Sequence, residues 1–320
     1  MTLLIQYTII FASVLLLVAL GGCFSERSGV INIGLEGIMV IGALGGALVM
    51  KFLPVSVGAP VMVLTVILAS AAAGLLYSLL LAVASITFRA DQTITGTAMN
   101  LLATAAATVA VKAMNASMSG GNDVSSDISY IEPKKLFILN IGKFEFNWFM
   151  LVAVIALIVS FAVLYKTRFG LRLRACGENP QAADSLGINV YKMRYAGTTI
   201  SGALAGMGGF VYALTTANCA SNGDVAGFGF LALAVMIFGN WKPVNIAVSS
   251  LLFGLFKCIA ASYASIDING DGVFMLAEIG ISAHLYRMLP YIVTLLVLAF
   301  TSKSSRAPKA EGIPYDKGQR

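Results

Sequence analysis

Long apolar runs alternate with short polar stretches along almost the whole chain. Each run approaches the ~20 residues that a helix needs to cross a hydrocarbon core of ~30 Å. The segments that we predict to be helical are 3–22, 30–51, 60–86, 94–114, 148–165, 196–217, 225–239, 243–263 and 286–302. The pattern indicates an all-α polytopic membrane protein with about eight to ten transmembrane helices.

Two of these segments are poor candidates for continuous crossings. Residues 30–51 are rich in glycine, and residues 225–239 are short for a full crossing. Non-helical backbone at membrane depth is tolerated where it is buried in protein or lines a wet cavity. We therefore expect one or two of the segments to be broken or re-entrant.

The composition agrees with a membrane protein. Of the 320 residues, 58% are hydrophobic and only 11% are charged, whereas soluble domains have ~25% charged residues. The formal net charge of +6 comes from Lys and Arg at the ends of apolar runs. These cations do not form a basic stripe with aromatic residues, so we expect contact with membrane lipid and none with nucleic acid. The four cysteines form no CxxC pair, which indicates neither zinc nor a disulfide framework.

Basic residues also predict the domain organisation and the orientation. We expect a single transmembrane permease domain over residues 1–302 and a basic tail over 303–320. Lys and Arg are concentrated in this tail and in the loop 166–194, whereas the loop 264–285 has none. Cytoplasmic loops carry the excess of basic residues, so the loop 166–194 and the C-terminus should be cytoplasmic and the N-terminus outside.

The basic loop contains a short helix with a capping signal at each end. Asn179 suits the N-cap, Pro180 the first helical position, and Gly187 the left-handed residue that follows a helix. Taken alone, this pattern is also typical of an ordinary surface helix between two spans.

Two stretches of the sequence resemble one family of membrane permeases. One, which begins at Gly177, reads GENPQAADSLGINVYKMRYAGTTISGALAGMGG; the other, at residues 25–47, reads SERSGVINIGLEGIMVIGALGGA. Both are similar to motifs of permease subunits of ABC importers for branched-chain amino acids, ribose-type sugars and nucleosides, and are closest to the nucleoside or "simple sugar" branch. The resemblance extends from about residue 10 to residue 302.

The resemblance implies that the capped helix is a coupling helix, which docks into a cleft of a separate ATPase. The residues that it assigns to this contact are Gly177, Glu178, Asn179, Pro180, Ala182, Ala183, Asp184, Gly187 and Ile188. The chain contains no GxxxxGK[ST] phosphate loop. We therefore expect a non-catalytic subunit without catalytic residues or a cofactor of its own, with ATP and Mg²⁺ held by the partner.

The resemblance also implies the remaining partners, the cargo and the location. We expect an ATP-binding cassette ATPase, a second and non-identical permease subunit, and an extracytoplasmic substrate-binding protein or lipoprotein, in the cytoplasmic (inner) membrane of a prokaryote. Nucleosides are the implied cargo, with ribose-like sugars or branched-chain amino acids as alternatives. A secondary transporter is the alternative of a different class, but internal repeats or a relay of ionisable groups in the membrane would then be expected.

Polar residues within the apolar segments are candidates for the translocation path. Asn32 and Glu36 are four residues apart, so a helix would place both on one face. A carboxylate at membrane depth costs ~2.5 to 3.5 kcal/mol and faces a cavity or a partner. We favour a path-lining or gating role, with a structural pair that Arg27 holds near the cytoplasmic mouth as the alternative. The further candidates for the path are Thr95, Asn100 and Asn218.

Two further patterns have simpler interpretations. Asp267, Asn269, Asp271 and Glu278 follow the spacing of an EF-hand loop, but these residue types gather in any exposed turn, so we predict no metal site and leave calcium as the alternative. Glycines four residues apart allow two helices to approach closely. The pairs that we expect to serve helix packing are Gly42 with Gly46 and Gly202 with Gly206.

Overall fold

The computed structural model describes residues 2–53, 57–121, 125, 127–129, 138–141, 144–215, 220–221, 223–263, 282–301 and 306–318. Over these residues the chain is a bundle of helices with two small antiparallel strand pairs, β1 with β4 and β2 with β3. The elements are, in chain order, α1 (Thr2–Arg27), α2 (Leu35–Phe52), α3 (Ala59–Ala82), the π-helical turn η1 (Val83–Thr87), α4 (Gln92–Ser119), β1 (Ile128–Ser129), β2 (Ile138–Ile141), β3 (Phe144–Asn147), α6 (Trp148–Lys166), α7 (Arg168–Glu178), α8 (Pro180–Ser185), α9 (Val190–Thr215), β4 (Ala220–Ser221), α10 (Phe228–Phe238), α11 (Pro243–Ser262) and α13 (Ala283–Thr301).

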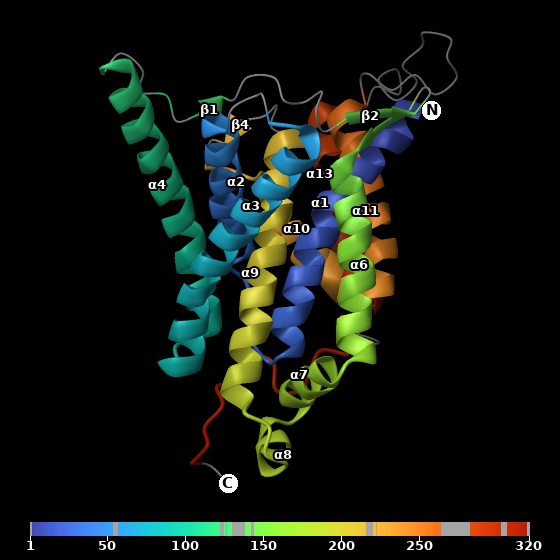
Figure 1. Ribbon diagram of the computed structural model, residues 1–320. Coiled ribbons are helices and arrows are strands. Elements are labelled where there is room, and N and C mark those ends of the chain that lie inside the picture. Colours follow the sequence, from blue (N-terminus) through green and yellow to red (C-terminus); the bar gives the residue numbers. More distant parts are fainter. Residues whose placement is uncertain are drawn as a thin grey trace.

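Helices α1 and α9 lie at the centre of the bundle (Figure 1). Helix α1 packs against α9 and α11, and α9 packs in addition against α2 and α3. Helix α4 stands at one edge, where its main contact is with α2. The short helices α7 and α8 lie at one end of the bundle, which we call the α8 end, and the strands lie at the opposite end, which we call the β end.

The central position of α1 follows from its sequence. This helix is apolar on every side, and Val14, Leu15, Leu17 and Val18 are all fully buried. A helix that is hydrophobic all round needs apolar neighbours on every face. The surrounding helices supply them, so α1 becomes the core of the bundle.

Glycines bring α2, α3 and α9 into close contact. A Cβ atom at Gly42 would collide with the backbone of Gly206, and one at Gly46 would collide with the ring of Phe210. A Cβ atom at Gly202 would collide with Ser78 of α3. The predicted packing role of these glycine pairs is therefore confirmed.

The helices confirm the prediction of a multi-pass membrane protein. Every segment predicted from the apolar runs contains a helix, although residues 30–51 and 225–239 are helical only in part. Within the described residues, six helices are long and apolar enough to cross a membrane: α1, α2, α3 with η1, α4, α6 and α11.

Neither doubtful segment is helical over its whole predicted length. Residues 28–34, which we call the α1–α2 break, are not helical, so α2 begins only at Leu35. Helix α10 has 11 residues, and at ~1.5 Å per residue it reaches about half of the hydrocarbon thickness. The expectation of a broken segment is confirmed for residues 30–51, and a re-entrant path of residues 225–239 stays a prediction.

Candidate functional site

Both short helices at the α8 end start with a side-chain cap. The Thr167 hydroxyl accepts a hydrogen bond from the backbone N–H of Gly170 (3.1 Å) at the start of α7. Oδ1 of Asn179 accepts one from the N–H of Ala182 (3.0 Å) at the start of α8, where Pro180 is the first helical residue. The N-terminal cap predicted for this helix is therefore confirmed.

The end of α8 also has the predicted geometry. Gly187 has φ +79°, and its N–H donates to the carbonyl of Asp184 (2.9 Å). The N–H of Ile188 donates to the carbonyl of Ala183 (3.1 Å). This left-handed C-terminal cap closes the helix after less than two turns.

The capped helix has an inner face and an outer face. Pro180 and Ala183 are buried, and Gly177 lies so close to the carbonyl of Arg27 that a Cβ atom would not fit. Leu186 is 81% exposed. The other exposed residues of this segment are Glu178, Asn179, Gln181, Ala182, Ser185 and Gly187. The segment is thus fixed on one side and open on the other.

The α1–α2 break is held by side chains of α4. The N–H of Ile31 donates to Oε1 of Gln92 (2.7 Å). The amide of Asn100 donates to the carbonyl of Ile33 (3.0 Å) and accepts from the N–H of Gly37 (2.8 Å). These bonds satisfy backbone groups that would otherwise be buried without partners.

Glu36 caps the N-terminus of the short helix α10. Its Oε1 accepts a hydrogen bond from the N–H of Gly227 (2.8 Å), and its Oε2 accepts one from the N–H of Gly229 (2.6 Å). A carboxylate at this position offsets the positive end of the helix dipole. Arg27 instead contacts the carbonyl of Trp241 (3.0 Å from Nη2) and Glu178, so Arg27 does not hold Glu36 as the alternative required.

Asn32 and Glu36 do not share a helix face, because the helix starts after Asn32. The amide nitrogen of Asn32 donates to the Ser201 hydroxyl of α9 (2.9 Å), and Oδ1 of Asn32 is buried without a protein partner among the described residues. The expectation of one shared face was wrong because it assumed a continuous helix through the glycine-rich segment.

The remaining candidates contribute less to this arrangement. The Thr95 hydroxyl donates to the carbonyl of Asp91 in the preceding turn of its own helix (2.7 Å). Asn218 and the EF-hand-like loop with Asp267, Asn269, Asp271 and Glu278 lie outside the described residues. In the part of the chain that the structure describes, no three His, Cys, Asp or Glu side chains gather as a metal site would require.

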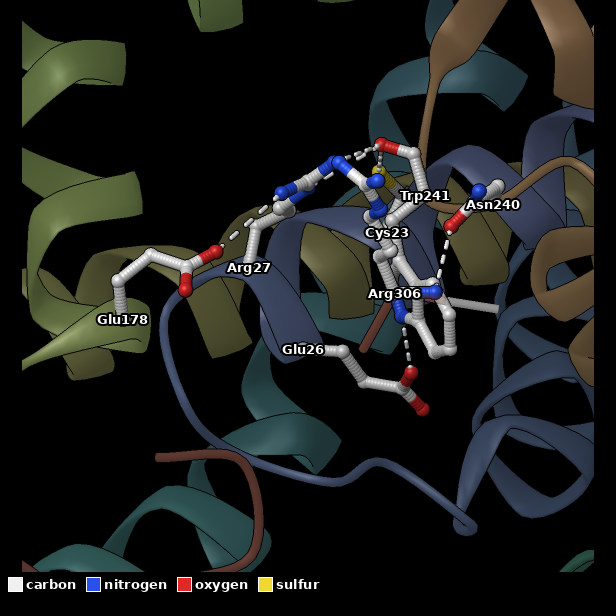
Figure 2. Close-up of polar contacts among 7 residues, drawn as sticks. All are labelled: Cys23, Glu26, Arg27, Glu178, Asn240, Trp241 and Arg306. Atoms are coloured by element: carbon white, nitrogen blue, oxygen red, sulfur yellow. Dashed lines mark hydrogen bonds and ion pairs between the residues drawn. The ribbon is translucent and has the colours of Figure 1, made fainter. Parts of the chain in front are cut away.

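The turn between α10 and α11 is clamped to the end of α1 (Figure 2). Nε and Nη2 of Arg27 and the thiol of Cys23 all donate to the carbonyl of Trp241 (3.1, 3.0 and 3.4 Å). The Trp241 indole N–H donates to Oε2 of Glu26 (2.6 Å). Asn240 and Trp241 have φ +53° and +52°, a strained conformation that these contacts hold in place.

Sequence reasoning missed the role of this clamp. Glu26 and Arg27 stand together in the motif at residues 25–47, and Trp241 stands in a short turn between two apolar segments. Adjacent opposite charges at a helix end, facing a turn with a tryptophan, are the signal that could have indicated it. Arg27 also reaches Glu178 of α7 (3.8 Å), so the clamp connects α1 with the segment 177–188.

The fold defines a class of protein. Long apolar helices around a half-length helix, with broken backbone buried inside the bundle, are typical of helical membrane transporters. The chain belongs to the family described as branched-chain amino acid transport system, permease component, whose model matches residues 4–298. Its role is therefore in transport.

Relatives from two bacteria match the chain over nearly its whole length. The "Guanosine ABC transporter permease protein NupQ" of Bacillus subtilis (strain 168) is 40% identical over 325 residues, which cover 100% of this chain and 98% of the relative. The "Nucleoside ABC transporter permease protein NupC" of Lactococcus lactis subsp. cremoris (strain MG1363) is 40% identical over 97% of this chain and 96% of its own length.

A more distant relative comes from the same Bacillus subtilis strain. The "Guanosine ABC transporter permease protein NupP" is 26% identical over 76% of this chain and 69% of its own length. No solved structure matches the chain.

Proposed function

We propose that this chain is a permease subunit of an ATP-binding-cassette importer for nucleosides. The observation that carries the proposal is the 40% identity, over essentially the whole chain, to relatives named as guanosine and nucleoside ABC transporter permeases. Ribose-like sugars and branched-chain amino acids remain the competing cargoes within the same family.

The α8 end supports docking of an ATPase. Helix α8 is capped at both ends, fixed on its inner face and exposed at Leu186 and Ala182. A rigid helix with a free face can receive a push from a partner and pass it on, whereas a flexible loop would absorb the motion. The residues in our proposal for this contact are those of the segment 177–188.

The distribution of charge supports a cytoplasmic α8 end. Helix α7, the α10–α11 turn and the C-terminal residues all lie at this end. The basic residues that they carry are Arg168, Arg172, Arg174, Lys242, Arg306 and Lys309. Cytoplasmic flanks of membrane helices are enriched in Lys and Arg, so the proposed orientation places the ATPase on the side where ATP is found.

A second, non-identical permease is part of the proposal. Two guanosine permeases are named in one Bacillus subtilis strain, and this chain is 40% identical to one and 26% identical to the other. The difference supports a pair of unlike permeases, in which this chain takes the place of the first. An extracytoplasmic substrate-binding protein or lipoprotein would deliver the cargo.

Purification of the full chain from membranes in mild detergent, with mass spectrometry of its partners and of any bound small molecule, tests the assembly. We expect an ATPase, a second permease and a binding protein. Proteoliposomes made from this complex should then take up labelled nucleosides in an ATP-dependent way, and labelled ribose or leucine at least about tenfold more slowly. Recovery of the chain alone, with uptake driven by an ion gradient, would contradict the proposal.

A further inference from the structure

Residues 306–318, which we call the C-terminal segment, lie across the α8 end and touch three separate parts of it. The N–H of Ala310 donates to the carbonyl of Gly177 at the end of α7 (2.8 Å), and the N–H of Gly312 donates to the carbonyl of Gly29 in the α1–α2 break (3.3 Å). The N–H of Arg306 donates to Oδ1 of Asn240 in the α10–α11 turn (2.9 Å). The contacts use the backbone, so they fix the path of the segment.

Arg194, near the start of α9, is the anchor of the C-terminal segment. Its side chain is 1% exposed and is the largest fully buried one among the described residues. Nη1 donates to the carbonyl of Ile313 (2.9 Å), and Nη2 lies 3.5 Å from the carbonyl of Ala310. A buried guanidinium without hydrogen-bond acceptors is costly, and the carbonyls that it contacts belong to the C-terminal segment.

An aromatic contact joins the C-terminal segment to α9, next to α7 and α8. Tyr315 is buried and packs edge to face on Tyr191, with ring centroids 5.4 Å apart. The same small apolar cluster contains Cys176 of α7 and Ala183 of α8. Tyr315 thus fills the space between the segment 177–188 and α9.

A paired charge holds the far end of the segment. The guanidinium of Arg89, between η1 and α4, donates to both carboxylate oxygens of Asp316 (2.9 and 3.0 Å). Bidentate pairs of this kind are geometrically specific even where they are solvent-exposed. The segment therefore reaches from the α10–α11 turn to the start of α4, beneath the helices of the bundle.

We propose that the C-terminal segment is a coupling element, which transmits movement of α7 and α8 to α1, α9 and the start of α4, and that Arg194 is its positioning residue. This inference rests on the proposed function, in which an ATPase drives α8. The segment 177–188 also packs on α1 at Gly177, but its ion pair to α1, Arg27–Glu178 at 3.8 Å, has Glu178 48% exposed. Exposed ion pairs are weak, so the backbone hydrogen bonds of the C-terminal segment strengthen the link between α7, α8 and the rest of the bundle.

Hydrogen exchange of the isolated permease tests whether the C-terminal segment holds α7 and α8 in place. The measurement requires neither nucleoside nor ATP. A chain that ends at Ser305 should lose protection at the amides of residues 177–190 by about tenfold or more, while the amides of α1 and α11 at the β end keep theirs. Arg194→Lys, which keeps the charge but cannot reach both carbonyls, should give an intermediate loss. Unchanged exchange at residues 177–190 in both variants would overturn the proposal.

Exchange of the charges of Arg89 and Asp316 tests, in the assembled complex, whether the C-terminal segment couples ATP hydrolysis to transport. Arg89→Asp and Asp316→Arg should each lower nucleoside uptake per ATP hydrolysed by about threefold or more, and the double variant should restore it. Lys166→Ala, which removes an exposed charge at the end of α6, outside both the C-terminal segment and the segment 177–188, is the control and should have no effect. Single variants that transport as the wild type does would overturn the proposal.

The two experiments separate the failure of this inference from the failure of the proposed function. If the wild-type complex moves no nucleoside, the proposed function is wrong, and the exchange of residues 177–190 still decides whether the segment holds α8. If the wild type transports and the paired variants behave as the control does, the coupling element is wrong and the importer stands.

Discussion

The α1–α2 break and the α7–α8 pair both interrupt the long helices, but they are held in different ways. In the break, backbone groups are satisfied by Gln92 and Asn100 of α4, and the following residue Glu36 caps α10. In the α7–α8 pair, the caps are local, and the outer face of α8 remains exposed. The comparison indicates that the break is held firmly inside the bundle, whereas α8 has an exposed outer face, as the proposed ATPase contact requires.

The largest loss of stability is expected from substitution of Glu36, which caps α10 beside the α1–α2 break. Glu36→Ala should lower the free energy of unfolding by about 3 kcal/mol or more, because it leaves the N–H groups of Gly227 and Gly229 without a buried acceptor. Glu36→Gln keeps one acceptor and should lose about half as much. Glu178→Ala, at an exposed ion pair, is the control and should change little. Unfolding in detergent measures all three, and a stable Glu36→Ala protein would refute the capping role.

A smaller loss is expected at the contact between the break and α4. Asn100→Ala removes the partner of the Gly37 N–H and of the Ile33 carbonyl, so the free energy of unfolding should fall by about 2 kcal/mol. Thr97→Ala is the control on the same helix, because its exposed hydroxyl bonds only to the preceding turn. Equal stability of the two variants would mean that the break is not held by α4.

The cap of α8 should matter for transport more than for stability. Asn179→Ala should cost about 1 kcal/mol locally and leave the unfolding of the whole bundle nearly unchanged. Uptake per ATP should nevertheless fall several-fold, because α8 frays where the partner is proposed to press. Asn147→Ala removes the corresponding cap of α6 at the β end, where Oδ1 accepts from the N–H of Phe149 (3.0 Å), and serves as the control. Equal loss of uptake in both variants would contradict the assignment of α8 as the site on which the ATPase acts.

The smallest effect is expected from pH. Burial raises the pKa of the Glu311 carboxyl to about 7, against the lowering effects of its contact with Glu26 and of the Arg27 charge. A raised pKa means that docking of the C-terminal segment is favoured below pH ~4.5 and loses this contribution as the pH rises to ~7. Protection of the segment's amides, corrected for intrinsic exchange, should fall over this range in the wild type and not in Glu311→Gln. The same pH dependence in both proteins would contradict the assignment.

The sequence predicts the helices well and their polar contacts poorly. Long apolar runs identify the crossings because hydrocarbon leaves few alternatives to a helix, and the Asn179, Pro180 and Gly187 pattern predicts both ends of α8. The position of Arg194 was not predictable, because it stands in a Lys- and Arg-rich loop where it is typical of a topology signal. Its partners are backbone carbonyls of Ala310 and Ile313, and backbone groups leave no trace in the sequence.

The candidates for the translocation path illustrate the same point, because their hydrogen-bond partners could not be predicted from the sequence. A spacing of four placed Asn32 and Glu36 on one face only if the helix was continuous, and glycine at position 34 together with the α4 amides favours the break instead. Asn100 was a candidate for the path because it is polar in an apolar segment, and its side chain bonds to backbone groups of Ile33 and Gly37. The path-lining role of these residues stays a prediction, which transport measurements of their variants test.

The coupling ratio of nucleoside uptake to ATP hydrolysis, measured in the same proteoliposomes, tests the central claim most directly. The test variant is Asn179→Ala with Gly187→Val, and the matched control is Asn147→Ala with Gly120→Val, because Asn147 is a helix cap at the β end, Gly120 has φ +64° and, as at Gly187, a Cβ atom would have open space. The account predicts a ratio at least about tenfold below the wild type in the test variant and a nearly normal ratio in the control. A normal ratio in the test variant would contradict the assignment of α8 as the coupling helix.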